Sequence, residues 1–388
     1  MSRTFVIAQG GGPTAVINQT LAGAVIGARH RHPDVTVLGA KHGVRGVAAD
    51  DFVDLTALSD DDLRRIANTP NSALGSTRDK PDAAYCGRIL EGLKKAKADA
   101  FVYIGGNDTA GTLQILEQSA GGAMRFVHAP KTIDNDLAEN DHTPGFISAG
   151  LFVARAFLSV DLDFRALPGI YVGIVMGRHA GFLTASAAAW RRHEDDGPHL
   201  VYVPEEPFSV ARLVADIQKT LDRFGRCVVA MSEGVTVESG VPLAESLIPE
   251  DRIERDAHGN MHLSGGDLGL ALQARLKVEF PKVRARVDTF GYLPRGFIGA
   301  ASDLDRTEAF EVGRYAVMAA EERSGSVAIQ YADRRTRLAL VGLDKVAGKT
   351  RVIPMEFLDP ATSHVSDAGM AYLARLLPER PDILTLPL

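Results

Sequence analysis

The sequence predicts an α/β protein of two lobes, in which parallel sheets lie between layers of helices. Three observations lead to this prediction. Short runs of β-branched residues alternate with segments of helix length along most of the chain. Strand-length runs such as 101–104 and 228–231 are apolar throughout, which is typical of parallel strands buried on both faces. A length of 388 residues is also well above that of one typical domain of about 150 residues.

The strands and helices can be assigned in chain order. In the first part of the chain, strands are each followed by a helix, at 4–8 and 15–29, 100–104 and 109–119, and 125–129 and 148–158. In the second part the pairs are 170–175 and 181–192, then 199–203 and 210–224, followed by strands at 227–231 and 284–290. A helix over 307–323 precedes strands at 327–330 and 337–341. This βα alternation favours parallel sheets covered by helices on both faces.

We expect three segments: a first lobe over 1–150, a second lobe over 151–304, and a C-terminal segment over 305–388 that packs back on the first lobe. Residues 238–266 combine Pro, Gly, His and charges without a clear period, so they are expected to form a loop or insertion.

Composition excludes several classes of partner. The formal net charge is -6 and no long basic run occurs, so we expect no nucleic-acid partner. No apolar stretch approaches the roughly 20 residues of a membrane helix, and we expect no membrane partner. The apolar run at 5–8 is too short for a secretion signal. Two cysteines, Cys86 and Cys227, are too few for a disulfide framework, so we expect buried thiols and a cytoplasmic location.

Glycine makes up 38 of the 388 residues, above the usual share of about 7%, and many glycines directly follow predicted strands. Small or charged residues follow seven strands, with the sequences GGG, GGND, PKTIDND, MGR, PEE, SEG and GYLPR. Any one of these could be a simple helix-entry turn. Ligands of open α/β sheets bind beyond the carboxyl ends of the strands, so we expect the seven turns to converge on one site.

Two glycine turns are suited to an anion and a metal ion. In residues 9–13 the missing Cβ atoms allow backbone N–H groups to approach a phosphate at a helix N-terminus, and Gly11 lies at the centre of the turn. In 105–109, Asn107 and Asp108 add oxygen atoms of the kind that Mg²⁺ prefers. Alternatively, Asp108 or Thr109 is only the N-cap of the helix that follows.

Residues 130–136 place a cation, a hydroxyl group and two carboxylates directly after an apolar strand. Phosphoryl transfer needs a carboxylate to accept the proton of the attacking hydroxyl, and cations to neutralise the transferring group. In an extended chain Asp134 and Asp136 project to one side and Lys131 to the other. The alternative is a solvated connecting loop.

The remaining strand ends carry groups suited to a phosphorylated sugar. Arginine binds phosphate through a two-pronged contact, and a carboxylate can accept from sugar hydroxyls. The residues that we single out for this role are Met176, Gly177, Arg178, Glu233, Tyr292 and Arg295.

Together these strings make the chain similar to the phosphofructokinase superfamily, and among its members it resembles those that use pyrophosphate. The similarity covers nearly the whole chain, through the strings GGGPTAVINQTLAG, NTPNSALGSTR, YIGGNDT, PKTIDNDL, DHTPGF, VMGRHAGFLTA, HLVYVPEEPF, VAMSEG and FGYLPR. The combination of GGND with PKTIDND is specific, whereas the first string alone also resembles NAD and lipid kinases.

The resemblance implies a fold, a reaction and residue roles. It implies a phosphofructokinase-like fold and a homodimer or homotetramer that reversibly transfers phosphoryl from pyrophosphate to the 1-hydroxyl of fructose 6-phosphate with Mg²⁺. Segment 1–150 would bind diphosphate and metal, and 151–304 the sugar phosphate. Asp134 would be the base and would contact the sugar together with Thr132. Gly11 would bind diphosphate and Asn107 the metal, while Met176, Gly177, Arg178, Glu233, Tyr292 and Arg295 match sugar-phosphate positions.

Two of these positions give a physical reason for a pyrophosphate donor. An acid at Asp108, where the ATP-dependent members have Gly, would repel the α-phosphate of ATP. Lys131, where those members also have Gly, would offset the charge of the transferring phosphoryl and the leaving group.

Departures from the family pattern leave the acceptor open. Upstream of MGR, Gly169 and Ile174 stand where the family usually has Arg and Glu, so a phosphate anchor is missing. The alternatives are a pyrophosphate-dependent kinase of another sugar phosphate, such as sedoheptulose 7-phosphate, and a catalytically silent sugar-phosphate sensor. A Rossmann dehydrogenase is disfavoured because the fingerprint glycines are absent.

Overall fold

A computed structural model describes residues 3–247 and 265–384, and its contacts divide the chain into two compact units. Unit 1 comprises Met1–Ala149 and Arg295–Arg351, and unit 2 comprises Gly150–Pro294 and Val352–Leu388. The expected C-terminal segment is therefore divided between the two, since the described residues from 352 onward belong to unit 2. There the backbone N–H of Val201 donates to the carbonyl oxygen of Ser363.

Unit 1 is built on a seven-stranded sheet in which five parallel strands are flanked by an antiparallel strand at each edge. Its order is β11-β10-β5-β4-β1-β2-β3. The strands are β1 (Thr4–Gln9), β2 (Thr36–Ala40), β3 (Phe52–Asp54), β4 (Ala100–Gly105), β5 (Arg125–Pro130), β10 (Gly325–Ala332) and β11 (Arg335–Val341). Within the sheet, β2 lies on one side of β1, whereas β4, β5 and β10 lie on its other side. The order thus reverses between β1 and β4, where open α/β sheets bind their ligands.

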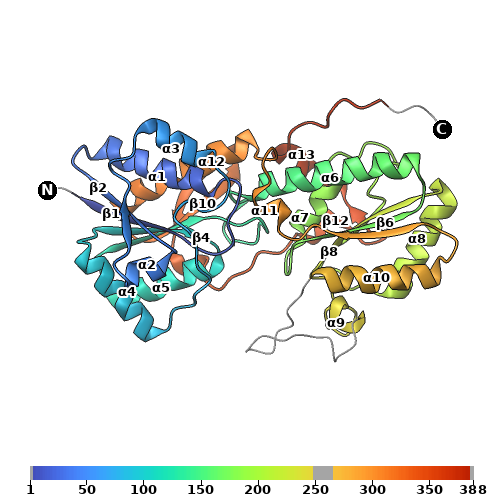
Figure 1. Cartoon of the computed structure of the whole chain (residues 1–388), viewed down its shortest axis with the longest axis horizontal. Coiled ribbons are helices and arrows are strands. Elements are labelled where there is room, and N and C mark those ends of the chain that lie inside the picture. The colour runs from blue at the N-terminus through green and yellow to red at the C-terminus, as the bar shows by residue number, and fades with distance from the viewer. Residues whose placement is uncertain (1–2, 248–264, 385–388) are drawn as a thin grey trace. The chain divides into compact units, whose positions relative to one another are not determined.

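Helices cover both faces of this sheet (Figure 1). One face is covered by α1 (Ile17–Arg31), α3 (Asp60–Ala67) and α12 (Asp303–Ala320), and the other by α2 (Val44–Ala48), α4 (Ala83–Lys95) and α5 (Asn107–Ala120). Helices α1 and α12 pack closely, since a Cβ on Gly23 would lie 2.0 Å from the carbonyl oxygen of Phe310.

Unit 2 holds a four-stranded parallel sheet in the order β7-β8-β6-β9. Its strands are β6 (Ile170–Val175), β7 (Leu200–Tyr202), β8 (Cys227–Ser232) and β9 (Ala285–Thr289). Buried apolar residues of α8 (Val210–Phe224), α9 (Leu243–Leu247) and α10 (Gly265–Glu279) pack on one face. The other face is covered by α6 (Phe146–Ala166) (Figure 1). Phe157 of α6 packs on Tyr171 of β6. The short elements are α7 (Phe182–Ala185), α11 (Leu293–Gly296), α13 (Asp367–Leu376), β12 (Leu358–Asp359) and β13 (His364–Val365).

The structure confirms the α/β class and the parallel sheets, with differences in detail. The helix expected over 181–192 is broken after α7 and a 3₁₀ turn at Ser186–Ala188, because the carboxylate of Asp196 binds the backbone N–H groups of Arg192 and His193. Of the segment 238–266, part forms α9, and residues 248–264 lie outside the described ranges. Both cysteines are buried and free, as expected. In the described part of the chain no helix combines the length and apolarity needed to cross a membrane.

Candidate active site

The glycine loop after β1 is held from two sides. The backbone N–H of Gly10 donates to Ile104 at 2.8 Å and that of Gly11 donates to Thr77 at 2.9 Å. Gly11 has a φ of +74°, in the left-handed region that favours glycine. A Cβ on Gly10 would lie 2.7 Å from the hydroxyl oxygen of Tyr103, so the loop packs directly on the end of β4.

Lys131 reaches this loop from the end of β5. Its side chain is buried, with 3% of the residue exposed, and its Nζ atom donates to the carbonyl oxygen of Gly12 at 2.6 Å. A Cβ on Gly11 would lie 3.2 Å from the same Nζ atom. Burial, followed by the positive charge of Arg295, lowers the pKa of Lys131 to about 8. The glycine loop therefore has a fixed ammonium group against its backbone.

The loop that carries Lys131 is not extended throughout, because it bends at Ile133 and Asp134 and Asn135 has a φ of +59°. Burial alternates along it: Lys131 and Asn135 are buried, whereas Thr132, Asp134 and Asp136 are partly exposed. Asp134 and Asp136 both lie close enough to Lys131 for their negative charges to oppose the lowering of its pKa. The backbone N–H of Asp134 donates to the hydroxyl of Thr132 at 3.1 Å, which turns the chain locally toward that side chain.

A second layer supports the loop from behind. The backbone N–H of Thr132 donates to Pro144, and the N–H of Arg351 donates to the carbonyl of Asp136 at 2.7 Å. The segment around Pro144 is in turn fixed by the buried Asp305 carboxylate, which accepts from the backbone N–H groups of Gly145 and Ser148. Burial raises the pKa of Asp305 to about 6.

The GGND turn begins α5, with Gly106 as its N-cap. Neither Asp108 nor Thr109 is the cap, so that alternative is wrong. The Nδ2 group of Asn107 donates to Oδ2 of Asp136 at 3.3 Å, and its buried Oδ1 atom has no hydrogen-bond partner among the described residues. The side chain of Asp108 is 69% exposed and pairs with Lys80 at 3.2 Å.

These groups suit a Mg²⁺ ion that takes part of its shell from water and substrate. They do not suit a metal ion whose ligands all come from the protein. Within residues 3–247 and 265–384 no three His, Cys, Asp or Glu side chains gather as a metal site. Mg²⁺ usually needs only one or two protein oxygens, and waters and substrate phosphates complete its shell. The amide oxygen of Asn107, which accepts from no described residue, lies beside the carboxylate of Asp136 and provides such a position.

In unit 2 the turns after β6 and β8 interlock. The backbone N–H of Glu233 donates to Val175 at 2.9 Å, and the hydroxyl of Ser232 donates to Gly177 at 2.5 Å. A Cβ on Gly234 would lie 2.0 Å from the carbonyl oxygen of Arg178. Met176, Gly177, Arg178 and Glu233 are thereby brought together at the carboxyl edge of the sheet.

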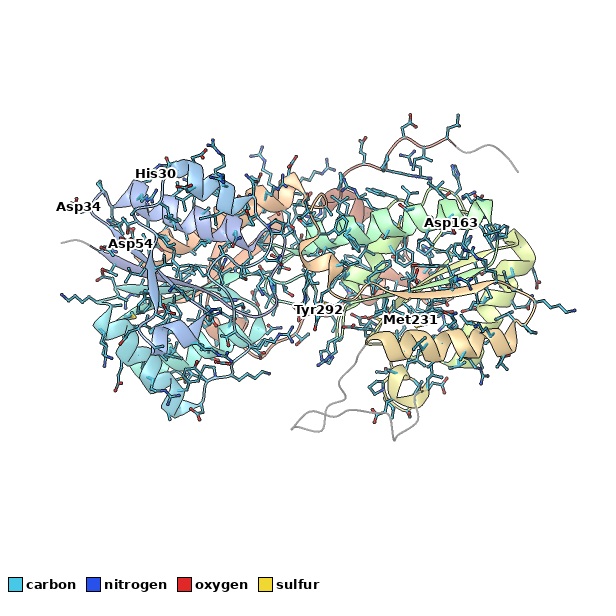
Figure 2. All side chains as sticks on the ribbon, in the orientation of Figure 1. His30, Asp34, Asp54, Asp163, Met231 and Tyr292 are labelled. Carbon is cyan, nitrogen blue, oxygen red and sulfur yellow. The ribbon has the colours of Figure 1, made fainter. Side chains whose placement is uncertain are left out.

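Tyr292 follows the neighbouring strand β9 at the same edge and is 67% exposed (Figure 2). Arg295, three residues later, belongs to unit 1, where it lies against Gly12. The seven turns thus form two groups. Those after β1, β4 and β5 lie in unit 1, and those after β6, β7, β8 and β9 in unit 2.

Sequence reasoning assigned no role to two basic residues beside the glycine loop, Arg78 and Lys80. The charge of Arg78 contributes to the lowered pKa of Lys131, and Lys80 pairs with Asp108. Asp79 between them binds Arg45 at 2.6 Å and accepts from the hydroxyl of Tyr85. The sequence did offer a signal for them, because Arg78 and Lys80 closely follow the Gly-Ser-Thr turn of the string NTPNSALGSTR, which is similar to the family.

The two departures from the family pattern have packing reasons. Ile174 is 1% exposed and belongs to the core beneath β6, where a carboxylate would be buried. Gly169 lies before β6, at the end opposite Met176, and a Cβ there would lie 2.5 Å from the carbonyl oxygen of Arg284.

Unit 1 has a parallel sheet covered by helices on both faces, with glycine turns where the strand order reverses. A buried lysine and paired carboxylates follow its strands. Together these features define an α/β protein with a site for a phosphorylated ligand. The family model described as Phosphofructokinase matches residues 4–320, and the chain belongs to this family.

Curated relatives and a solved structure are similar along almost the full chain. Proteins named pyrophosphate--fructose 6-phosphate 1-phosphotransferase from Rhodospirillum rubrum and Xanthomonas campestris pv. campestris are 49% and 33% identical to it. The alignments cover 96% of this chain in both cases, and 93% and 91% of the relatives. The crystal structure of a pyrophosphate-dependent phosphofructokinase from Marinobacter aquaeolei has a TM-score of 0.85 and 26% identity, covering 97% of this chain and 92% of that one.

Proposed function

We propose that the protein reversibly transfers a phosphoryl group from pyrophosphate to the 1-hydroxyl of fructose 6-phosphate, giving fructose 1,6-bisphosphate and phosphate, a step of glycolysis. The observation that carries this proposal is the buried ammonium group of Lys131 against the glycine loop, on the segment that also presents Asp134. The names of the two relatives, at 49% and 33% identity, support the same donor and acceptor.

In this reaction Asp134 accepts the proton of the sugar hydroxyl as it attacks phosphorus. Thr132, whose hydroxyl accepts from the backbone N–H of Asp134, contacts the sugar beside it. The diphosphate approaches the loop at Gly11, where the missing Cβ leaves space beside Lys131. The ammonium group of Lys131 neutralises the charge on the leaving phosphate.

We propose Mg²⁺ as the cofactor, held by Oδ1 of Asn107 together with waters and diphosphate oxygens. When bound, Mg²⁺ would withdraw charge from the phosphoryl oxygens. The supporting observation is a buried amide oxygen that no described residue satisfies.

Donor choice is assigned to Asp108 together with Lys131. Asp108 lies in the first turn of α5, where its carboxylate would face the α-phosphate of ATP and repel it, whereas pyrophosphate has no third phosphate to place there. The ion pair with Lys80 joins two exposed side chains, so solvent weakens its effect on that carboxylate.

The sugar phosphate is assigned to unit 2. Arg178 is exposed at the turn after β6 and can bind phosphate through two N–H groups, while Glu233 can accept from sugar hydroxyls. Met176, Gly177 and Tyr292 complete this set at the same edge of the sheet.

We also propose a homodimer or homotetramer that acts in the cytoplasm, where phosphorylated sugars are retained. The exposed apolar side chains of Leu270 and Val278 on α10, at 71% and 75% exposure, support a contact between copies.

The acceptor can be tested by product identification. Pyrophosphate, Mg²⁺ and fructose 6-phosphate should give fructose 1,6-bisphosphate in a phosphorus NMR spectrum, and sedoheptulose 7-phosphate should react at a lower kcat/KM. A higher kcat/KM for sedoheptulose 7-phosphate would make the protein a kinase of that sugar. No turnover of either sugar would favour a silent sensor.

A further inference from the structure

A buried histidine, His128, lies in β5 and has no role in the proposed reaction. It is fully buried, and its strand neighbours Val127 and Ala129 belong to the apolar core on one face of the sheet. Because side chains alternate along a strand, His128 faces the opposite side, which α5 covers. An imidazole ring in such a place is costly unless both of its nitrogen atoms have hydrogen-bond partners.

Both ring nitrogens of His128 are partnered, and the partners fix the tautomer. The Nε2 atom lies 2.8 Å from the carbonyl oxygen of Gly105, which can only accept, so Nε2 carries the proton. The Nδ1 atom lies 2.8 Å from the hydroxyl oxygen of Ser326 on β10, and in a neutral ring it accepts from that hydroxyl. Burial, with a smaller contribution from the charge of Lys131, lowers the pKa of His128 to about 4, so the ring is neutral at physiological pH.

The carbonyl oxygen of Gly105 is shared between His128 and Lys131. The backbone N–H of Lys131 donates to the same oxygen at 2.9 Å. Gly105 is the last residue of β4, and the residue after it is the N-cap of α5. A Cβ on Gly105 would lie 2.0 Å from Oγ1 of Thr109, so no side chain can anchor this position. The orientation of the Gly105 peptide group therefore depends on its two donors.

Loss of the imidazole would leave neither of its partners without a hydrogen bond. The carbonyl of Gly105 would keep the backbone N–H of Lys131, and the hydroxyl of Ser326 also donates to the carbonyl oxygen of Val327 at 3.2 Å. An apolar residue of similar size at this position should therefore cost little stability through unpaired groups. What the imidazole adds is a second, fixed donor to the Gly105 carbonyl.

We propose that His128 is a positioning residue of the candidate active site, which holds the Gly105 peptide group in the orientation that presents Asn107 and Asp108 to the diphosphate. This inference rests on the proposed function and assigns a residue that acts through Gly105 without touching the ligands. Lys131 makes the same connection through its backbone, so the turns after β4 and β5 are joined at one carbonyl oxygen.

The test is calorimetric titration of the purified full chain with pyrophosphate in MgCl₂ and, separately, with fructose 6-phosphate. His128→Leu should weaken pyrophosphate binding by roughly 10-fold, as expected when a group that orients a metal ligand is lost, and should change fructose 6-phosphate binding by less than about twofold. His128→Gln should bind pyrophosphate within about threefold of the unaltered chain, because its side-chain amide can still donate to Gly105 and accept from Ser326. His364→Leu is the matched control in unit 2, where the imidazole also contacts a backbone carbonyl, and should change neither affinity.

Nitrogen-15 NMR of the chain with labelled histidine gives a second readout that does not depend on activity. The ring signals that disappear in His128→Gln belong to His128. They should show a protonated Nε2 and an unprotonated Nδ1 throughout the range from about pH 6 to 9.

Four results would overturn the inference and leave the proposed function intact: unchanged pyrophosphate binding in His128→Leu, equal weakening of both ligands, binding by His128→Gln as weak as that by His128→Leu, or a proton on Nδ1 in place of Nε2. Failure of the unaltered chain to bind pyrophosphate would overturn the proposed function and the inference with it. If thermal unfolding shows that His128→Leu does not fold, Ser326→Ala takes its place. Removing the hydroxyl that holds Nδ1 should weaken pyrophosphate binding alone and by a smaller factor, and unchanged binding would overturn the inference.

Discussion

The Nζ atom of Lys131 lies 2.6 Å from the carbonyl oxygen of Gly12, so a side chain at the end of β5 reaches the loop after β1. Strand β4 lies between these two strands, and the lysine extends across its carboxyl end. A positive charge is thereby placed on the glycine loop before any ligand binds. Preorganised charge of this kind is what stabilises a phosphoryl group in transfer.

Lys131→Met should raise KM for pyrophosphate at least about 10-fold, because an anion loses a buried cationic partner. In the unaltered protein KM for pyrophosphate should also rise as pH increases through about 8, since the lowered pKa of Lys131 removes its proton there. Lys131→Arg keeps its charge at every assay pH and should lose this rise. Steady-state kinetics between about pH 6.5 and 9.5 test this. If KM for pyrophosphate still rises with pH in Lys131→Arg as it does in the unaltered protein, Lys131 does not have the proposed role in binding diphosphate.

Asp134→Asn should lower kcat by at least about 100-fold with little change in either KM, because the amide cannot accept the hydroxyl proton. Asp136→Asn, two residues further along the same loop, is the matched control and should lower kcat less. Turnover near that of the unaltered chain would show that Asp134 is not the base.

Asp108→Gly should admit ATP as a donor by removing both the charge and the bulk at the start of α5. Asp108→Asn separates the two effects, because it removes only the charge. Coupled assays with ATP measure both variants. If neither variant uses ATP, exclusion at Asp108 does not determine the donor.

Asn107→Leu should raise the Mg²⁺ concentration that gives half-maximal rate, since Oδ1 is its proposed oxygen ligand. Asn107→Asp should lower that concentration because a carboxylate binds the ion more strongly. Magnesium titrations at saturating substrates provide the measurement. If the unaltered protein and both variants need the same Mg²⁺ concentration for half-maximal rate, the ion binds elsewhere.

His142 gives a prediction about stability. Burial disfavours its charged form, but hydrogen bonds to Asp141 and Glu308 outweigh burial and raise its pKa to about 9. Its stabilising contribution should therefore be complete below about pH 6.5 and be lost as pH rises through about 9.

His142→Gln should lower the free energy of unfolding by about 3–5 kcal/mol at neutral pH, since it leaves the buried carboxylate of Glu308 and the partly exposed one of Asp141 without their cation. It should also reduce the loss of stability between about pH 6.5 and 9. Denaturant unfolding measures both effects, with the exposed His30→Gln as a control. The same pH dependence in His142→Gln would show that another group causes it.

Much of the fold was predictable because buried parallel strands are apolar runs of characteristic length. Strand β6 and helix α8 begin and end as expected. Strand β2 was missed because its five residues, TVLGA, are short and contain a glycine. Helix α10 was missed because it has three glycines and little separation of apolar from polar residues.

The candidate site was predictable where one turn carries several groups, as in the segment from Lys131 to Asp136. The position of Arg295 was not predictable. A sequence pattern relates a residue only to its neighbours along the chain, and α11 crosses from unit 2 into unit 1. Lys80 pairs with a residue 28 positions away and the charge of Arg78 acts on one 53 positions away, which the local sequence does not reveal.

The most direct test of pyrophosphate as the donor is the initial rate with fructose 6-phosphate and Mg²⁺, comparing pyrophosphate with ATP, together with the reverse reaction from fructose 1,6-bisphosphate and phosphate. We expect turnover in both directions with the pyrophosphate couple and none with ATP. Turnover with ATP and none with pyrophosphate would contradict the roles given to Lys131 and Asp108.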